Sequence, residues 1–127
     1  MELIAMIEVR SYGTSGPWVV LLHGGPGAPG YMEPVATRLA DTFRVLEPLQ
    51  RSSGAERLTV ARHVEDLHHV VVARCEGVQP ALVGHSWGAM LALAFAATYP
   101  GSSGPLVLIG CGSFDPASRA TMQRILE

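Results

Sequence analysis

The sequence predicts an α/β fold, a three-layer sandwich in which helices cover both faces of a mostly parallel sheet of about five strands. Short apolar runs of strand length alternate along the chain with segments whose apolar residues recur at helical spacing. The runs are continuously apolar, which is typical of strands buried on both faces of a parallel sheet. The length of 127 residues suits a single domain, residues 1–127.

Five segments are predicted as strands. Residues 3–10 form an apolar run bounded by charged side chains, which indicates an edge strand, and a glycine-rich turn over residues 11–17 follows it. The other predicted strands are 18–22, 43–49, 80–85 and 105–110. Ligands collect at the carboxyl ends of parallel strands, so the residues just after these runs are candidates for a site. They include His23, Ser86 and Cys111.

Four segments are predicted as helices, which connect the parallel strands through right-handed crossovers. The first is residues 31–40, with Met32, Val35 and Leu39 on one face. The second follows the N-cap Thr59 and ends before Gly77, with Val60, Val64, Leu67 and Val71 at helical spacing. The third is residues 87–99, which is apolar almost all round, and the last has Asp115 as N-cap and Pro116 at its first position.

The motif Gly84-His85-Ser86-Trp87-Gly88 stands between a predicted strand and a predicted helix. A serine at such a sharp turn is lifted out of the sheet, so its hydroxyl is exposed for nucleophilic attack. Gly84 and Gly88 leave room for the close backbone crossing, and the helix N-terminus favours an oxyanion beside the serine. The alternative is a glycine-rich turn whose serine only caps the helix.

A second motif, His23-Gly24-Gly25-Pro26-Gly27, forms a loop after the strand at 18–22. In this order and on these elements, the two motifs resemble the α/β-hydrolase superfamily, and in particular its prolyl-iminopeptidase-like branch. The resemblance covers almost the whole chain and implies an α/β-hydrolase fold that is truncated here, with only its N-terminal portion present. Residues 50–54 resemble an Asp-Gln-Arg-Gly-Ser-Gly loop of that branch, with Leu49 in place of the aspartate and Ser52 in place of a glycine.

The resemblance implies a serine hydrolase that cleaves an ester, amide or related bond through an acyl-serine intermediate. Ser86 would be the nucleophile, and the backbone N–H groups of Trp87 and of Gly24 or Gly25 would form the oxyanion hole. Each such donor is worth about 3–4 kcal/mol in the transition state. Esterases, aminopeptidases and carbon–carbon hydrolases share the motifs, so the substrate stays open beyond a small molecule.

The acid and base of a catalytic triad are missing from the chain. The family order is serine, acid and then histidine, but no histidine follows Ser86. We expect His23 to shape the glycine loop, His85 to point away from Ser86, and His63, His68 and His69 to lie on a solvated helix face. Asp115 is better explained as a helix N-cap than as a triad acid.

Composition excludes several other classes of protein. A net charge of −2 without a basic cluster argues against nucleic acid, and no apolar run is long enough to cross a membrane. Acidic residues near the N-terminus and two cysteines, Cys75 and Cys111, that make no disulfide framework favour a cytoplasmic protein with free thiols. No phosphate-binding motif or metal cluster is present, so we expect no cofactor and no metal.

Two further readings stay open: a non-catalytic module that binds a small molecule in the same pocket, and an inactive truncated fragment. If the chain is the N-terminal part of a hydrolase, residues 115–127 resemble the start of a lid segment. The strand at 105–110 would then be an unpaired apolar edge, from which we expect a homo-oligomer or aggregation.

Overall fold

The computed structural model describes residues 7–25, 29–51, 58–111 and 116–126. These residues form a sheet with the strand order β1-β3-β2-β4-β5. The strands are β1 (Val9–Tyr12), β2 (Trp18–Leu22), β3 (Arg44–Pro48), β4 (Ala81–His85) and β5 (Leu106–Ile109). Only β1 is antiparallel to its neighbour, β3, and the remaining strands run parallel. The carboxyl ends of β2, β3, β4 and β5 therefore meet at one edge of the sheet, as the sequence predicts.

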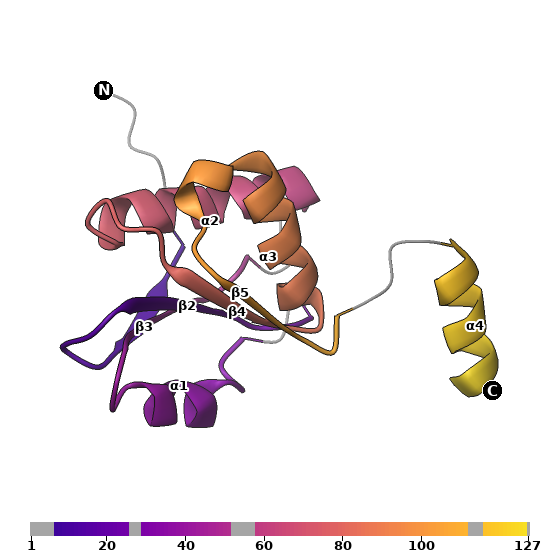
Figure 1. Cartoon of the computed structure of the whole chain (residues 1–127), viewed down its shortest axis with the longest axis horizontal. Helices are drawn as coiled ribbons and strands as arrows, with labels where there is room; N and C mark the ends of the chain where they lie inside the picture. Colours follow the sequence, from indigo (N-terminus) through magenta and orange to yellow (C-terminus); the bar gives the residue numbers. More distant parts are fainter. Residues whose placement is uncertain (1–6, 26–28, 52–57, 112–115, 127) are drawn as a thin grey trace.

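The helices are α1 (Glu33–Leu39), α2 (Val60–Arg74), α3 (Trp87–Thr98) and α4 (Pro116–Leu126). α2 and α3 cover one face of the sheet, α1 covers the other, and α4 lies beyond β5 at the side of the sandwich (Figure 1). The N-cap predicted for α2 is confirmed, because the Thr59 hydroxyl accepts a hydrogen bond of 3.1 Å from the Arg62 N–H. A single turn of 3₁₀-helix, Pro100–Ser102, follows α3.

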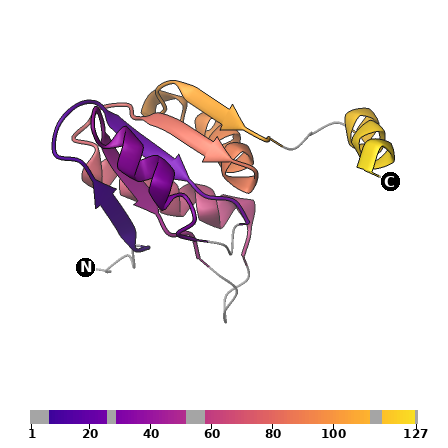
Figure 2. The same ribbon diagram turned by 90° about the horizontal axis from the view of Figure 1, so that it is seen from below.

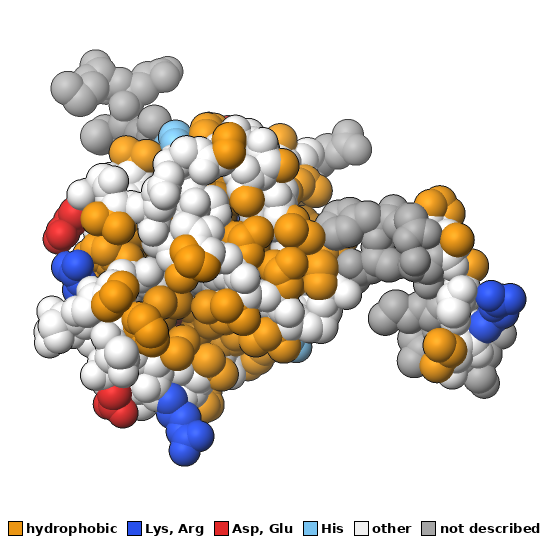
Figure 3. Space-filling view, in the orientation of Figure 1, with side chains coloured by type: hydrophobic (Ala, Val, Ile, Leu, Met, Phe, Trp, Pro, Cys, Tyr) orange, Lys and Arg blue, Asp and Glu red, His pale blue; other side chains and the backbone are white. Residues whose placement is uncertain are grey.

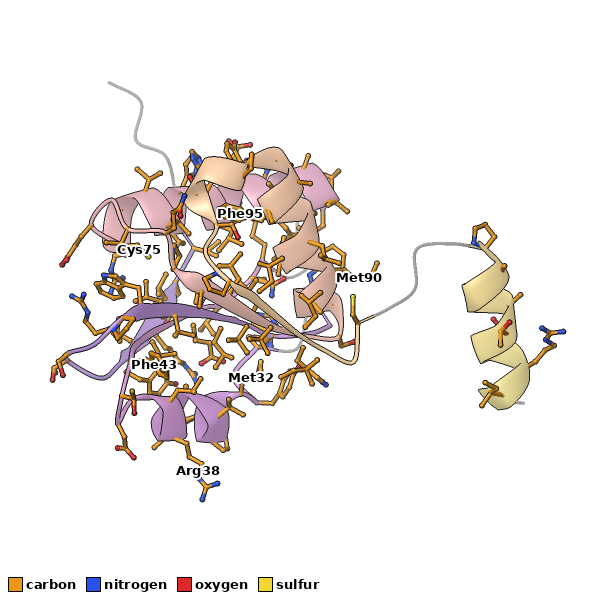
Figure 4. All side chains as sticks on the ribbon, in the orientation of Figure 1. Met32, Arg38, Phe43, Cys75, Met90 and Phe95 are labelled. Carbon is orange, nitrogen blue, oxygen red and sulfur yellow. The ribbon has the colours of Figure 1, made fainter. Side chains whose placement is uncertain are left out.

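Two buried clusters hold the layers together. The larger lies between the sheet and helices α2 and α3 and includes the fully buried side chains of Phe95 and Cys75. The smaller lies between the sheet and α1 and includes Met32, with Phe43 packed against it. Figure 4 shows these two pairs on opposite sides of the strands. The alternating faces of β2 feed these two separate cores, which is why its sequence is apolar throughout.

Several boundaries and faces differ from the prediction. β1 begins at Val9 and continues through Ser11 and Tyr12, which were predicted as part of a turn; their pairing with β3 makes them strand. In α1 the buried residue is Ala36, whereas Val35 is 42% exposed. A seven-residue helix buries only a narrow stripe, and a shift of one residue rotates that stripe by about 100°. In α2, the predicted core residue Val60 is exposed at the first turn.

The sheet is less completely covered than predicted. In the described part of the chain, α1 is the only helix on its face and lies over β2 and β3, leaving that side of β4 and β5 open (Figure 2). Val107 and Ile109 of β5 are consequently 48% and 45% exposed. Apolar side chains gather on the surface seen in Figure 3, which includes this side of the molecule. β5 is an edge strand in the described sheet, as expected for residues 105–110.

Candidate active site

Ser86 occupies the turn between β4 and α3 in a backbone conformation that residues other than glycine rarely adopt. Its backbone has φ +57° and ψ −116°, and it is one of two non-glycine residues with positive φ among those described. Such strain costs about 1–3 kcal/mol and persists only where the surrounding structure enforces it. The Ser86 side chain makes no capping hydrogen bond to α3, and the residue is exposed. The alternative of a simple capping serine is therefore wrong.

Two glycines enforce this turn. A Cβ atom at Gly84 would lie 2.3 Å from the Gly88 carbonyl oxygen, and a Cβ atom at Gly88 would lie 2.1 Å from the Leu22 carbonyl oxygen. Both contacts are with backbone, which cannot rotate aside. The Ser86 N–H is fixed as well, because it donates a 2.9 Å hydrogen bond to the Ile109 carbonyl. Neighbouring strands therefore hold the serine at the carboxyl edge of the sheet.

The glycine loop after β2 lies directly against this turn. A Cβ atom at Gly24 would be 3.2 Å from the Ser86 Cβ and 3.1 Å from the His85 carbonyl oxygen. Any side chain at position 24 would thus crowd the serine. Gly25 follows with φ +107°, again a conformation suited to glycine. The structure thus brings the two sequence motifs together at Gly24 and Ser86, which are 62 positions apart in the chain.

A buried hydrogen-bond network connects the loops after β2, β3 and β4. The Gln50 N–H donates to His23 Nε2 at 3.0 Å, so His23 carries its proton on Nδ1, which donates to the Gly24 carbonyl at 2.8 Å. The Gln50 side chain donates to the His23 carbonyl and accepts from Trp87 Nε1, at 2.8 and 2.7 Å. Both ring nitrogens of His23 are therefore occupied, and this histidine shapes the glycine loop as predicted.

Arg51, which follows Gln50, anchors the loop after β3 to α2. Arg51 donates two hydrogen bonds to the Asp66 carboxylate, Nε to Oδ2 at 2.6 Å and Nη2 to Oδ1 at 2.9 Å. The Asp66 side chain is only 4% exposed, so the pair is shielded from water on that side. Sequence reasoning missed Asp66, since no spacing rule links it to Arg51. The Gln50-Arg51 pair thus holds the loops of the site rather than presenting reactive groups.

Tyr31 is a second residue that sequence reasoning missed. Its hydroxyl accepts a 2.8 Å hydrogen bond from the Gly24 N–H and lies 2.6 Å from His85 Nδ1. The two rings meet edge to face with centroids 5.6 Å apart. His85 therefore bonds to Tyr31, not to its neighbour Ser86. The sequence offers no local pattern for this contact, because His85 is 54 positions from Tyr31; the only signal is that a tyrosine follows soon after the glycine loop.

The histidines of α2 do not form the solvated face that the sequence suggested. His63 is 3% exposed and packs edge to face on the Trp87 ring, with centroids 5.7 Å apart. Burial lowers the pKa of His63 below its ordinary value, although the Asp66 carboxylate opposes this. His68 stacks on Tyr99 with ring centroids 3.8 Å apart. None of these rings has a hydrogen bond to Ser86 in the described structure.

Some predicted positions fall outside the described residues: Asp115, Pro26, Gly27 and Ser52. Cys75 is fully buried, and burial raises the pKa of its thiol to about 11. Cys111 is half-buried, and both cysteines are free. Among the described side chains there is no group of three or more His, Cys, Asp or Glu that could hold a metal ion. Within the same residues, every helix is too short or too polar to traverse a bilayer.

Comparison with known proteins decides the family. The model of the alpha/beta hydrolase family matches residues 19–127. The chain belongs to this family. A protein of Streptomyces coelicolor described as "Probable proline iminopeptidase" is 36% identical over 122 residues, covering 86% of this chain and 37% of that protein. A "Probable aminopeptidase" of Bacillus subtilis is 31% identical over 101 residues, covering 69% and 32%.

Solved structures agree with this α/β-hydrolase assignment. A marine microorganism esterase superposes with a TM-score of 0.74 at 26% identity, covering 95% of this chain and 49% of the esterase. A protein of Mycobacterium tuberculosis described as "Putative non-heme bromoperoxidase BpoC" gives a TM-score of 0.76 at 25% identity, covering 97% of this chain and 48% of that protein. The chain therefore spans about a third of the curated relatives and about half of these solved chains.

Proposed function

We propose that this chain carries the nucleophile and oxyanion hole of a serine hydrolase acting on an ester, amide or related bond of a small molecule. The observation that carries the proposal is the strained, exposed Ser86, which lies in one motif and against the glycine loop of the other, with no side-chain capping hydrogen bond to explain its conformation. Family membership and the relatives described as peptidases and esterases support the same reaction class. A strained backbone conformation whose side chain makes no capping hydrogen bond points to function.

In the proposed reaction, Ser86 Oγ attacks the carbonyl carbon of the substrate and its proton passes to a base. The Oγ–C bond forms, the leaving alcohol or amine departs with a proton, and water releases the acid from the acyl-serine. The N–H of Trp87, at the first turn of α3, and the N–H of Gly25 would stabilise the oxyanion. Gly24 is the weaker candidate, because its N–H is already bonded to Tyr31.

The base is the part of this proposal that the five histidines do not supply. His23 uses both ring nitrogens, His85 bonds to Tyr31, and the three histidines of α2 have no hydrogen bond to Ser86 among the described residues. We place the acid and base outside these 127 residues, which is supported by the fraction of each relative that the chain spans. An oxyanion hole and substrate binding without the triad still give about 10³–10⁴-fold acceleration over water.

Labelling with a fluorophosphonate tests the proposal directly. The serine oxygen forms a bond to phosphorus and the P–F bond breaks, so intact mass reports each modification. We expect slow labelling of the purified chain at one site, mapped to Ser86 by peptide mass and lost in Ser86→Ala. Ser102→Ala is the matched control, because Ser102 lies in the 3₁₀ turn after α3. Labelling that persists in Ser86→Ala, or no labelling at all, would refute the nucleophile.

The missing base also favours a second function, a non-catalytic module that binds a small acyl compound in this site. It predicts no modification of Ser86 but saturable binding of a small carboxylic acid or ester without turnover. Modification of Ser86 separates the two proposals, and calorimetric titration of the wild-type chain and of Gly24→Val tests whether the compound binds at this site. A side chain at position 24 would meet the Tyr31 hydroxyl and the Ser86 Cβ at 2.9 and 3.2 Å, and so would block the site.

A further inference from the structure

The Tyr31 hydroxyl joins two parts of the site that are far apart in the sequence. On one side it accepts the Gly24 N–H at 2.8 Å, and on the other it lies 2.6 Å from His85 Nδ1. Gly24 belongs to the glycine loop, and His85 is the last residue of β4 before Ser86. One oxygen atom therefore connects the proposed oxyanion loop to the strand that carries the proposed nucleophile.

The chemistry of the three groups fits this connection. A tyrosine hydroxyl can accept one hydrogen bond and donate another at the same time. It accepts from the Gly24 amide, and its own proton can go to His85 Nδ1 when the neutral imidazole is protonated on Nε2. At 2.6 and 2.8 Å both contacts lie within the normal range. The edge-to-face packing of the rings keeps the hydroxyl in this position.

The position of the hydroxyl also matters for the oxyanion hole. The Tyr31 oxygen and the Ser86 Cβ lie 2.9 and 3.2 Å from the same point, the site of a Cβ on Gly24. Tyr31 holds the Gly24 N–H, which belongs to the peptide before Gly24, and His23 Nδ1 holds the Gly24 carbonyl, which belongs to the peptide after it, so Gly24 is held on both sides and the following peptide is fixed in orientation. That peptide carries the Gly25 N–H, which is the donor left for the oxyanion. An oxyanion hole acts through donors placed before the reaction, so orientation of this peptide governs the rate.

We propose that Tyr31 is a positioning residue, whose hydroxyl clamps the Gly24 N–H to His85 and so helps to set the Gly25 N–H, the oxyanion donor on the next peptide, relative to Ser86. This inference rests on the proposed function and deepens it. Tyr31 does not act on the substrate itself but through the glycine loop. Misplacement of a catalytic group by about 1 Å costs on the order of 100-fold in rate.

The test compares Tyr31→Phe with wild type in fluorophosphonate labelling of the full chain, across a range of probe concentrations. We expect the maximal labelling rate to fall about 10- to 100-fold, while the probe concentration for half-maximal rate changes little. Tyr99→Phe is the matched control: its ring stacks on His68, and its hydroxyl has no hydrogen bond among the described residues. Equal rates in Tyr31→Phe and wild type would overturn the proposal.

Amide hydrogen exchange of Gly24 and Gly25 by NMR separates positioning from direct participation. The clamp predicts faster exchange at Gly24 in Tyr31→Phe and an unchanged pattern in Tyr99→Phe. A slower labelling rate with unchanged Gly24 exchange would mean that Tyr31 acts directly on the reacting group, which also overturns the clamp. Urea unfolding of each variant checks that the fold is retained, so a rate loss is not a folding defect.

A double-mutant cycle adds a readout that a general structural role would not give. If Tyr31 acts through His85, the rate losses in Tyr31→Phe and His85→Ala do not add in the double variant. His85→Gln keeps an acceptor for the hydroxyl and is expected to retain more of the wild-type rate than His85→Ala. Additive losses would overturn the clamp. Absence of Ser86 labelling in wild type would overturn the proposed function and the positioning role of Tyr31 together, whereas Gly24 exchange would still report the contact.

Discussion

Substitution of Gly88 by alanine is the sharpest test of how the elbow is built. A Cβ at this position would lie 2.1 Å from the Leu22 carbonyl oxygen, 2.7 Å from the Leu22 carbonyl carbon and 2.8 Å from the His23 carbonyl oxygen. Ordinary contacts begin near 3.4 Å, so α3 and the end of β2 must separate by 1.3 Å, the difference between 3.4 and 2.1 Å. All three atoms belong to the backbone of a central strand and its following loop.

The cost follows from this geometry. Overpacking a well-packed interior costs about 1–3 kcal/mol, and here no side chain can rotate away, so we expect the upper end of that range. Alanine recovers about 0.5–1 kcal/mol relative to glycine in a helix. The free energy of unfolding should therefore fall by about 2 kcal/mol. The same separation would move the glycine loop from Ser86 and slow labelling on the order of 100-fold.

Urea unfolding followed by circular dichroism measures the first effect, and fluorophosphonate labelling measures the second. Gly101→Ala is the matched control, because no atom lies within 4 Å of a Cβ at that position. We expect its free energy of unfolding to stay within about 0.5 kcal/mol of wild type. If Gly88→Ala and Gly101→Ala unfold at the same urea concentration, the elbow is not constrained by the backbone crossing and the reasoning is refuted.

Three further outcomes are expected. Because burial lowers the pKa of His63, the unfolded state binds a proton at this residue more readily than the folded state does. The stabilising effect of His63 is therefore complete above its unfolded pKa of about 6.5 and is lost as pH falls. In urea unfolding, His63→Gln should weaken the decline in the free energy of unfolding between pH 7 and pH 5, and an unchanged decline would contradict this. The β5 edge should pair with a second copy of the chain, since residues 77–114 contain no Asp, Glu, Lys or Arg to discourage pairing. Val107→Lys should reduce the mass measured by light scattering, whereas Val72→Lys on α2 should not. A monomeric wild type would contradict this prediction. Cys75 is buried and the pKa of its thiol is raised to about 11, so it should resist a thiol reagent at pH 8 until the chain unfolds. Cys111 is only half-buried and should react in the native state. Equal reaction rates for the two cysteines would show that the interior opens readily.

The sequence alone determined the order of strands and helices and the positions of the two motifs. Continuous apolar runs of five or six residues such as 18–22, bounded by turn residues, predict buried strands, and the carboxyl ends of these strands share an edge when the connections are right-handed crossovers. The glycines around Ser86 could also be interpreted locally, because a sharp strand-to-helix turn has few solutions. Thr59 capped its helix as expected, since a cap depends on residues close together in the chain.

Only the tertiary structure decided which distant side chains meet. Tyr31 bonds to His85, Gln50 to Trp87 and Arg51 to Asp66 across separate loops, and no periodicity encodes such pairs. The same holds for His63, whose helical position fits either a solvated or a buried face until Trp87 is placed against it. Short-range preferences fix the elements, whereas the contacts that orient a site depend on how loops from different strands come together at one edge of the sheet.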